Sequence, residues 1–448
     1  MKQRYILLLA MLGLGAASCN YLDVKPTGQV IPETVSEYRA MLTTGYKFPG
    51  YKQLLAVRAD EVFPYSNNST YDEYISVALW DESNPGSYTD AYPWLSMYNT
   101  IFYANSVIAA DMKAERNVGG DTEGQLKAEA YLLRAYTHFE LLNLYAKPYS
   151  AATASTDRGV PLALRIDIEQ DYVPATVEKV YDQILEDIRS GQELMQVEEQ
   201  PVSTRYRFSK QSAKALEARV RLYRSEWSEA LAAAQELLPC ELKDLNDPSA
   251  VAQWYYNSKE AIQTLDWVNG RSNQLINGKL FTISNLMDKY NKDNDLRMKK
   301  YTFNSKGTWQ PNGELKDKMI MTFRSAEIYL IAAESAAHIE GQLTVAKGYL
   351  KQLMEKRLTP DYYAERAALV DAMTQSELLS EIADERLREL ALEGHRWFDL
   401  RRTTRPQITK VYTDKNNNEQ TAILQANDAR YTIRFPKEAI ANNPSLND

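Results

Sequence analysis

The 448-residue chain is long enough for one large domain or for two or three domains of ordinary size. Hydrophobic residues make up 44% and charged residues 25%, a globular balance that can bury a sizeable core. The formal net charge of −8 argues against nucleic acid as a partner, because phosphate backbones are bound by basic surfaces.

The first 18 residues are predicted to be a secretory signal peptide. Basic residues precede an apolar run at 6–14, which is too short to span a bilayer, since a spanning helix needs roughly 20 residues. Small residues then lead into Cys19, as in the lipobox of bacterial lipoproteins, although Ala16 stands where leucine is commonest. We therefore expect residues 1–18 to be removed and Cys19 to be acylated. Plain secretion with an unmodified Cys19 is the alternative.

The cysteine content agrees with a lipid-anchored protein. An acylated Cys19 leaves Cys240 as the remaining thiol, so no intrachain disulfide is expected. More than one acyl chain is sufficient for stable anchoring, whereas a single chain is not. The mature chain is expected to be a soluble globule tethered to a membrane.

Most of the mature chain is predicted to be helical. Apolar and small residues recur at three- and four-residue spacing in the segments 123–148, 177–195, 323–356 and 375–393. The best strand signals are short, at 260–267 and 431–436.

Two stretches, 216–238 and 332–354, repeat one plan of a helix, a short turn and a second helix. Small residues recur where the antiparallel helices must approach closely, which is typical of tetratricopeptide hairpins. Such a hairpin needs stacked neighbours to bury its apolar face, and the pairs 99–115/123–145 and 177–195/209–224 can supply them. The predicted fold is mainly α, with stacked tetratricopeptide-like hairpins forming one scaffold that carries long irregular loops and a few short strands.

Three regions lose the helical period: 46–98, 266–315 and 403–430. The first two are rich in aromatic residues and in Asn, Ser, Pro or Gly. Loops of this length in a compact domain are usually functional or disordered, and the aromatic content argues against disorder. We therefore expect 46–98 and 266–315 to form a binding face.

The stretch 385–402, ERLRELALEGHRWFDLRR, combines arginines, carboxylates, a histidine and a Trp-Phe pair. This composition suits a catalytic centre, a clamp for an anionic ligand or a part of the scaffold. A helix ending at Gly394 is predicted, followed by apolar anchors that leave Arg396, Arg401 and Arg402 to pair with carboxylates. The scaffold interpretation is favoured.

No catalytic, metal or cofactor site is predicted. The sequence lacks the His-Glu-x-x-His, Cys-x-x-Cys and Gly-x-Ser-x-Gly motifs, and His138, His338 and His395 are interpreted as structural. A glycosidase needs only two carboxylates well placed in space, which sequence spacing does not reveal, so hydrolysis remains an alternative.

The segment RELALEGHRWFDLRR (388–402) closely resembles a motif of the SusD/RagB family. Further segments resemble family motifs in the family's order: CNYLDVKP (19–26), RADEVF (58–63), MYNTIFYANSVI (97–108), AEAYLLRAYTHFELLNLYAKPY (128–149), RGVPLAL (158–164), ATVEKVYDQILEDI (175–188), SKQSAKALEARVRLYRSEWSEALAAAQELL (209–238), FRSAEIYLIAAES (323–335) and FPKEAIANNPSLN (435–447). The chain departs from the pattern at Ala175, where arginine is common, and lacks the usual terminal Gln-Asn-Pro-Gly-Tyr.

The resemblance implies one domain over 19–448, with its scaffold chiefly at 97–240 and 323–400 and its ligand loops chiefly at 46–98 and 266–315. It implies a non-catalytic lipoprotein exposed on the Gram-negative outer membrane. Such a protein caps a SusC-like TonB-dependent β-barrel transporter and delivers captured oligomers to it. The ligand would be an oligosaccharide or polysaccharide fragment; the alternative is an oligopeptide.

The same resemblance locates candidate ligand contacts, because the family's starch binder carries its ligand aromatics shortly after the Asp-Glu pair. A flat aromatic ring stacks on a sugar face, while Asn and Arg donate to hydroxyls. Trp80 and Trp94 are interpreted as packing anchors. The candidate ligand contacts are Phe63, Tyr65, Asn67, Asn68, Tyr71, Tyr74, Trp267, Asn269, Arg271 and Asn273.

Overall fold

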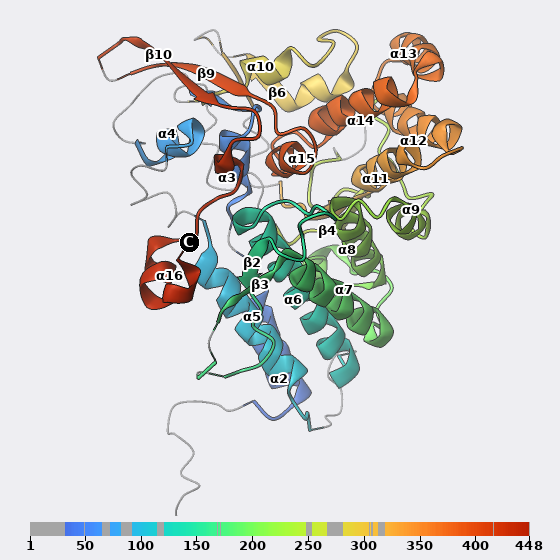
Figure 1. Cartoon of the computed structure of the whole chain (residues 1–448). Helices are drawn as coiled ribbons and strands as arrows, with labels where there is room; N and C mark the ends of the chain where they lie inside the picture. Colours follow the sequence, from blue (N-terminus) through green and yellow to red (C-terminus); the bar gives the residue numbers. More distant parts are fainter. Residues whose placement is uncertain are drawn as a thin grey trace, which may run out of the picture.

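Antiparallel helices stacked side by side form the scaffold, as Figure 1 shows for the computed structural model of the chain. The structure describes residues 32–48, 50–64, 72–81, 92–113, 121–167, 169–170, 172–247, 253–266, 281–303, 305, 308–311, 319–414 and 416–447. The helices are α2 (Val35–Gly45), α3 (Lys52–Arg58), α4 (Asp72–Leu79), α5 (Trp94–Ile108), α6 (Glu123–Tyr145), α7 (Val177–Leu194), α8 (Lys210–Tyr223), α9 (Trp227–Gln235), α10 (Ser284–Met287), α11 (Ser325–His338), α12 (Leu343–Glu355), α13 (Pro360–Ala372), α14 (Gln375–Glu389), α15 (Arg396–Arg402) and α16 (Lys437–Asn442).

The helices pack in chain order, which confirms the predicted stack of hairpins. Each of α5 to α8 lies against the next, α9 joins α8 to α11, α12 lies between α11 and α13, and α14 packs on α11. The predicted stripe of α7 is buried, with Val180, Ile184 and Ile188 at most 1% exposed. At Gly191 of the same helix, a Cβ atom would lie 2.6 Å from Leu132 Cγ. Only glycine therefore permits α6 and α7 to approach so closely.

The two repeated hairpins, α8/α9 and α11/α12, join through stacked rings. Trp227 at the start of α9 lies on His338 at the end of α11, with ring centroids 3.9 Å apart and an interplanar angle of 13°. Gly341 makes the α11–α12 turn with φ of +79°, a conformation that suits glycine. His338 is thus a packing residue in the scaffold, as its position in the sequence predicted.

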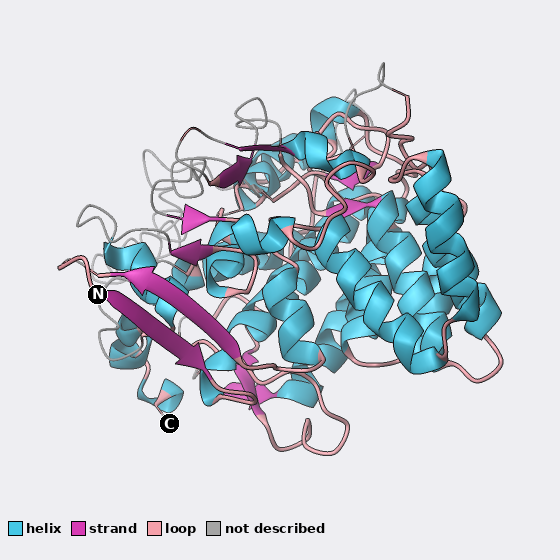
Figure 2. Ribbon diagram, turned by 90° about the horizontal axis from the view of Figure 1, so that it is seen from above, coloured by secondary structure: helices cyan, strands magenta, loops and turns pink. Residues whose placement is uncertain are grey.

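Strands occur only as two-stranded antiparallel ladders among the described residues, and Figure 2 shows them in magenta beside and between the helices. The pairs are β1 (Phe63–Pro64) with β5 (Phe281–Thr282), β2 (Arg158–Pro161) with β3 (Pro174–Thr176), β4 (Ala261–Gln263) with β8 (Phe323–Arg324), β6 (Tyr301–Phe303) with β7 (Trp309–Pro311), and β9 (Ile408–Thr413) with β10 (Glu419–Leu424).

The strand predicted at 431–436 is wrong, whereas β4 confirms the one at 260–267. Asp428 caps a short 3-10 turn that ends at Tyr431. After this turn, the Ile433 amide donates a hydrogen bond to the Leu144 carbonyl of α6 instead of pairing with another strand. The hairpin β9–β10 lies in the region 403–430, which shows no helical period but was not predicted to form strands.

A cluster of buried charges joins the second half of the scaffold. Glu389 at the end of α14 accepts hydrogen bonds from Arg324 (2.6 Å), Arg357 (2.9 Å) and Arg297 (3.1 Å). Glu260 binds Arg357 at 2.7 Å. All five side chains are at most 3% exposed. We call these five residues the buried ion network. Burial opposes ionisation of Glu389, but the three arginines outweigh it and hold its pKa well below the usual value.

The segment 385–402 belongs to this scaffold. Arg396 pairs with Asp60 at 2.8 Å and Arg402 with Glu334 at 2.5 Å, as predicted. Arg401 differs, because it donates to the backbone carbonyls of Asn143 and Ala146 where α6 ends. The last carbonyls of a helix lack partners within that helix, so a buried guanidinium satisfies them without a carboxylate. Burial lowers the pKa of Arg401 to about 10.

The helix α14 ends at Glu389 rather than at Gly394. The chain then turns, and the turn brings Glu393 to 2.9 Å from Arg324 Nε. Gly394 closes the turn with φ of +83°, and a Cβ atom there would lie 2.7 Å from Lys52 Cβ. The turn after α14 thus places Glu393 on Arg324 of the buried ion network, and glycine allows the turn to pack against α3.

We predict that Arg357→Ala destabilises the protein by about 3–5 kcal/mol, because it leaves two buried carboxylates only partly compensated. The matched control is Arg189→Ala, since the exposed Arg189 pairs with Glu186 and Glu193 on the surface of α7. The urea midpoint should fall sharply for Arg357→Ala and stay nearly unchanged for Arg189→Ala. Equal midpoints for both variants would contradict a stabilising role of the network.

Candidate functional site

The two loop regions predicted to bind ligand meet at their bases. Phe63 in β1 pairs with Thr282 in β5, which joins the region 46–98 to the region 266–315. The second region continues this contact, because the Ile283 amide donates to the Trp309 carbonyl of β7 at 3.5 Å. We call the strands β1, β5, β6 and β7 the loop base. The ladders thus bring together two segments more than 200 residues apart in the chain.

Two of the predicted ligand contacts lie within the described residues. Phe63 in β1 is partly exposed, and Lys410 of β9 lies against its ring. Tyr74 in α4 is partly buried and packs against the main core, which leaves less of its ring for a ligand. The remaining candidates fall outside the described residues, as does Cys19: Tyr65, Asn67, Asn68, Tyr71, Trp267, Asn269, Arg271 and Asn273.

Two further aromatic side chains stand on the loop base. Phe303 and Trp309 face each other across the β6–β7 ladder, with ring centroids 5.2 Å apart. Phe303 is 59% exposed and Trp309 partly so. Both lie in the predicted binding region 266–315, but neither is among the predicted ligand contacts. The segments YTF (301–303) and WQP (309–311) are too short for alternation to predict a ladder, so only the pairing of β6 with β7 brings the rings together.

The predicted packing anchors are confirmed. Trp80 is fully buried, and its indole nitrogen donates to the Arg58 carbonyl at 2.9 Å. Its φ of +54° is uncommon for an aromatic residue, and burial and hydrogen bonding hold it in that conformation. Trp94 packs edge-on against Tyr145 and Phe435, with centroids 5.1 Å from each. Trp80 is therefore not available as a ligand platform, whereas Trp94 is partly exposed and lines the apolar groove described below.

The Asp-Glu pair before Phe63 attaches the loop base to the scaffold. Asp60 forms a two-pronged ion pair with Arg396, with both contacts at 2.8 Å. Glu61 is 1% exposed and accepts a hydrogen bond from the Leu392 amide at 2.7 Å, while its second oxygen has no hydrogen-bond partner among the described residues. Burial raises the pKa of Glu61 to about 7. These carboxylates are therefore structural rather than a solvent-facing catalytic pair.

An apolar groove of about 900 Å³ lies between α5, the segment after β2 and α16. Leu95, Phe102 and Ile166 line it and are 73%, 49% and 50% exposed. The Tyr98 hydroxyl and the Asn105 amide donate to backbone carbonyls of the groove's own wall. Tyr98 and Asn105 thus use their donors within the wall of the groove, while other polar side chains, among them Asn99, Glu438 and Asn442, also line it.

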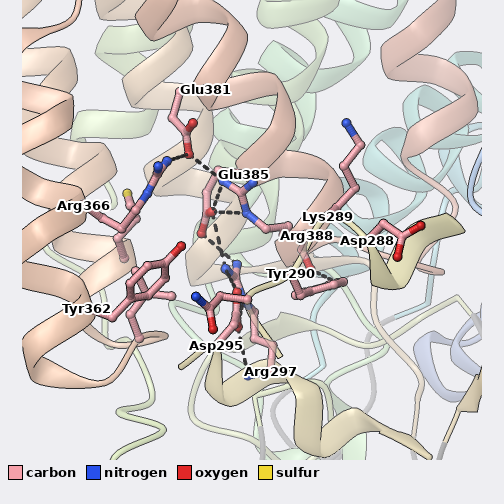
Figure 3. Close-up of a pocket in the computed structure, with 13 residues that line it drawn as sticks. Asp288, Lys289, Tyr290, Asp295, Arg297, Tyr362, Arg366, Glu381, Glu385 and Arg388 are labelled. Carbon is pink, nitrogen blue, oxygen red and sulfur yellow. Dashed lines mark hydrogen bonds and ion pairs between the residues drawn. The ribbon is translucent and has the colours of Figure 1, made fainter. Parts of the chain in front are cut away.

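A charged pocket of about 380 Å³ lies between α12, α13 and α14, and Figure 3 shows its lining. Four basic and four acidic side chains line it. Arg366 and Arg388 both bind Glu381, and Arg388 also binds Glu385, which in turn holds Arg297. The charges compensate one another, so the pocket extends the buried ion network and presents no unpaired arginine for an anion.

The described residues offer neither a metal cluster nor a membrane span. No group of three or more His, Cys, Asp or Glu side chains within the described ranges is placed to hold a metal ion. None of the described helices is both long and apolar enough to cross a membrane.

Comparison with known proteins gives two family matches and a set of similar folds. A family model described as starch-binding and associating with the outer membrane matches residues 20–222, and the SusD family model matches residues 252–445. SusD-like protein P38 of Formosa agariphila is 25% identical over 433 residues, covering 79% of this chain and 80% of that protein.

Solved structures share the fold at low sequence identity. A SusD superfamily protein from Bacteroides fragilis has a TM-score of 0.72 at 20% identity, covering 93% of this chain and 99% of that one. A laminarin-binding SusD-like protein has a TM-score of 0.59 at 19% identity, covering 83% and 92%. At these identities the likeness concerns the fold alone.

The stacked hairpins with an aromatic loop base define a class, namely helical scaffold proteins that present a candidate binding face on their loops. Within that class, this chain belongs to the SusD/RagB-like family.

The raised pKa of Glu61 predicts a pH-dependent stability. Between pH 4.5 and about 7 the folded protein keeps a proton on Glu61 that the unfolded chain releases, so the free energy of unfolding falls as pH rises through this window. Glu61→Gln removes this pH-dependent loss of stability, because glutamine does not titrate, and it keeps an acceptor for the Leu392 amide. Between pH 5 and pH 8 the free energy of unfolding of the variant should rise by on the order of 2–3 kcal/mol relative to that of the wild type.

Urea unfolding of both proteins at the two pH values measures this gain. Glu198→Gln is the matched control, because Glu198 is exposed and the same substitution there should give no pH-dependent difference. A constant difference between wild type and Glu61→Gln across the range would show that Glu61 is ionised throughout.

Proposed function

We propose that the protein is a non-catalytic surface lipoprotein that captures oligosaccharides or polysaccharide fragments and delivers them to a TonB-dependent outer-membrane transporter. The observation that carries the proposal is the loop base of a SusD/RagB-like chain, where Phe63, Phe303 and Trp309 expose aromatic rings on neighbouring ladders. The family description, starch-binding and associating with the outer membrane, and the laminarin-binding relative support a glycan as the ligand.

The chemistry of the loop base fits sugar capture. Aromatic rings stack on the C–H faces of sugar rings and need no deep pocket, while side-chain amides and guanidinium groups donate to hydroxyls. Asn67, Asn68, Asn269 and Arg271, which lie outside the described residues, are the proposed donors. A few such contacts give a Kd on the order of micromolar to millimolar, which allows release to a transporter.

Lipidation is part of the proposal. Acylation of Cys19 would anchor the chain at the outer membrane, with the globular part held at the surface beside the SusC-like partner. The mature protein would then need no spanning helix of its own, and the described helices are compatible with that arrangement.

An oligopeptide ligand is the second candidate, and the strand ladders favour it. Every ladder among the described residues has only two strands, so each strand has an outer edge without a strand partner there. An extended peptide can add to such an edge through backbone hydrogen bonds. The β6–β7 ladder combines an edge of this kind with two partly exposed aromatic rings.

Calorimetric titration of the soluble form starting at Asn20 tests the proposal. Neutral glycans, acidic glycans and mixed oligopeptides are the ligands, with reducing-end and amine release measured afterwards. We expect one glycan class to bind without cleavage, and expect Phe63→Ala, Tyr65→Ala and Trp267→Ala to weaken binding about tenfold while the proteins stay folded. Binding of peptides alone would establish the second candidate, and any cleavage would exclude a non-catalytic role.

Phe102→Ala is the matched control, because it removes a half-exposed phenylalanine from the apolar groove instead of the loop base. Glycan affinity should be unchanged in this variant. Loss of affinity in Phe102→Ala with full affinity in Phe63→Ala would move the binding site to the groove. Unfolding of Tyr65→Ala or Trp267→Ala would contradict their assignment to ligand loops.

A further inference from the structure

A buried lysine lies directly beneath Phe63. Lys410 in β9 is fully buried, and its Nζ atom lies 5.5 Å from the centroid of the Phe63 ring and 4.9 Å from that of Trp80. The same atom donates to the Val57 carbonyl at 2.7 Å. The ammonium thus lies close to both rings and is bonded to the end of α3. One side chain connects the β9–β10 hairpin, the scaffold and the first strand of the loop base.

The position is unusual for a lysine because no carboxylate within the described residues forms an ion pair with it. Buried lysines are normally paired, since removing an ammonium from water costs several kcal/mol. Here two aromatic faces and one carbonyl replace the missing carboxylate. A cation near an aromatic face is attracted to the ring, and the attraction is strongest where water is excluded.

The charged groups around Lys410 come from several elements. Arg58, Asp60 and Glu61 face it from the end of α3, and Asp60 is already held by Arg396 of α15. On the side of α4, Asp81 follows Trp80 in the chain. Arg430, which is paired with Asp428, donates to the Trp80 carbonyl at 3.5 Å.

These neighbours stabilise the protonated form of Lys410 only weakly. Burial lowers the pKa of Lys410 to about 7, and Arg58 adds to the lowering, while Asp60 and Glu61 raise it in part. Protonated and neutral forms are therefore both populated near neutral pH.

We propose that Lys410 is a positioning residue for Phe63: its cationic form holds the ring in place, and ligand affinity at the loop base falls when the amine becomes neutral. The inference rests on the proposed function, because it assumes that Phe63 contacts the ligand. It goes further in making uptake depend on pH through a residue that never touches the ligand. The neutral amine still donates to Val57, so the loop base stays folded while the attraction between ammonium and ring is lost.

The first experiment needs no ligand. The protein is labelled with ¹³C at lysine Cε and at phenylalanine ring carbons, and Lys410→Met and Phe63→Leu identify the two resonances. A pH titration should give a midpoint near 7 for Lys410 and a shift of the Phe63 ring signal with the same midpoint. A midpoint above 9, or a Phe63 signal that does not follow Lys410, overturns the proposal even if a glycan binds.

The second experiment measures affinity for the glycan or peptide found by calorimetry, at pH 6 and pH 8. The wild type should bind on the order of tenfold more weakly at pH 8, the loss expected for a desolvated cation–π contact. Lys410→Arg keeps a permanent charge, so its affinity should be the same at both pH values and close to that of the wild type at pH 6. Lys410→Met should bind weakly at both.

Glu61→Gln is the control for the other group that titrates near pH 7 in this cluster. The variant keeps Lys410, so its affinity should still fall between pH 6 and pH 8. The role of Lys410 is overturned if the ligand affinity of the wild type does not change with pH, or if Glu61→Gln alone abolishes that affinity.

If Lys410→Arg or Lys410→Met does not fold, the pH dependence of affinity in the wild type and in Glu61→Gln decides. If no ligand binds at all, the proposed function fails, and the resonance titration still decides whether Lys410 holds Phe63.

Discussion

The buried ion network centred on Glu389 is the constraint on which the rest of the structure depends. Arg324 precedes α11, Arg357 follows α12, Arg297 lies in the turn before β6, and all three converge on one carboxylate at the end of α14. Buried charges of this kind add little net stability, because desolvation offsets their attraction, but removing one partner leaves another uncompensated. The network therefore defines how four separate segments fit together more than it strengthens the fold.

The position of the loop base follows from this constraint. Because α14 stops at Glu389, the next residues form a turn that presents the Leu392 amide to Glu61 and the Arg396 side chain to Asp60. The residues just before β1 are thus attached to the scaffold by one contact from the turn and one from the first residue of α15. These two contacts hold Phe63 on a well-supported strand.

Contacts between cations and aromatic rings connect this part of the scaffold to the hairpin β9–β10. Lys410 lies close to the rings of Phe63 and Trp80, and the Arg58 guanidinium lies 4.9 Å from the ring centroid of Trp397, which itself stacks on Tyr431. Lys410 is buried against two rings, and no carboxylate among the described residues forms an ion pair with it. Ring faces stabilise a cation without the permanent opposite charge of a carboxylate, so a lysine in this layer can lose its proton near neutral pH.

The sequence by itself determined the elements whose signal is local. The stripe Val180, Ile184 and Ile188 was enough to predict α7, and the two repeated hairpins were enough to predict a stacked helical scaffold. The ion pairs of Arg396 and Arg402 also followed from their position beside apolar anchors. Periodicity within one element records which face is buried, and that information is present in a short window of residues.

Only the tertiary structure decided which distant segments meet. The carbonyl partners of Arg401, the contacts of the turn after α14 and the position of Lys410 beneath Phe63 all depend on residues far apart in the chain. Strands of two or three residues carry too little alternation to be recognised, and a lysine in a polar region gives no sign that it is buried. The sequence thus predicted where the helical scaffold is interrupted, and the packing of the scaffold determined which of the described segments meet there.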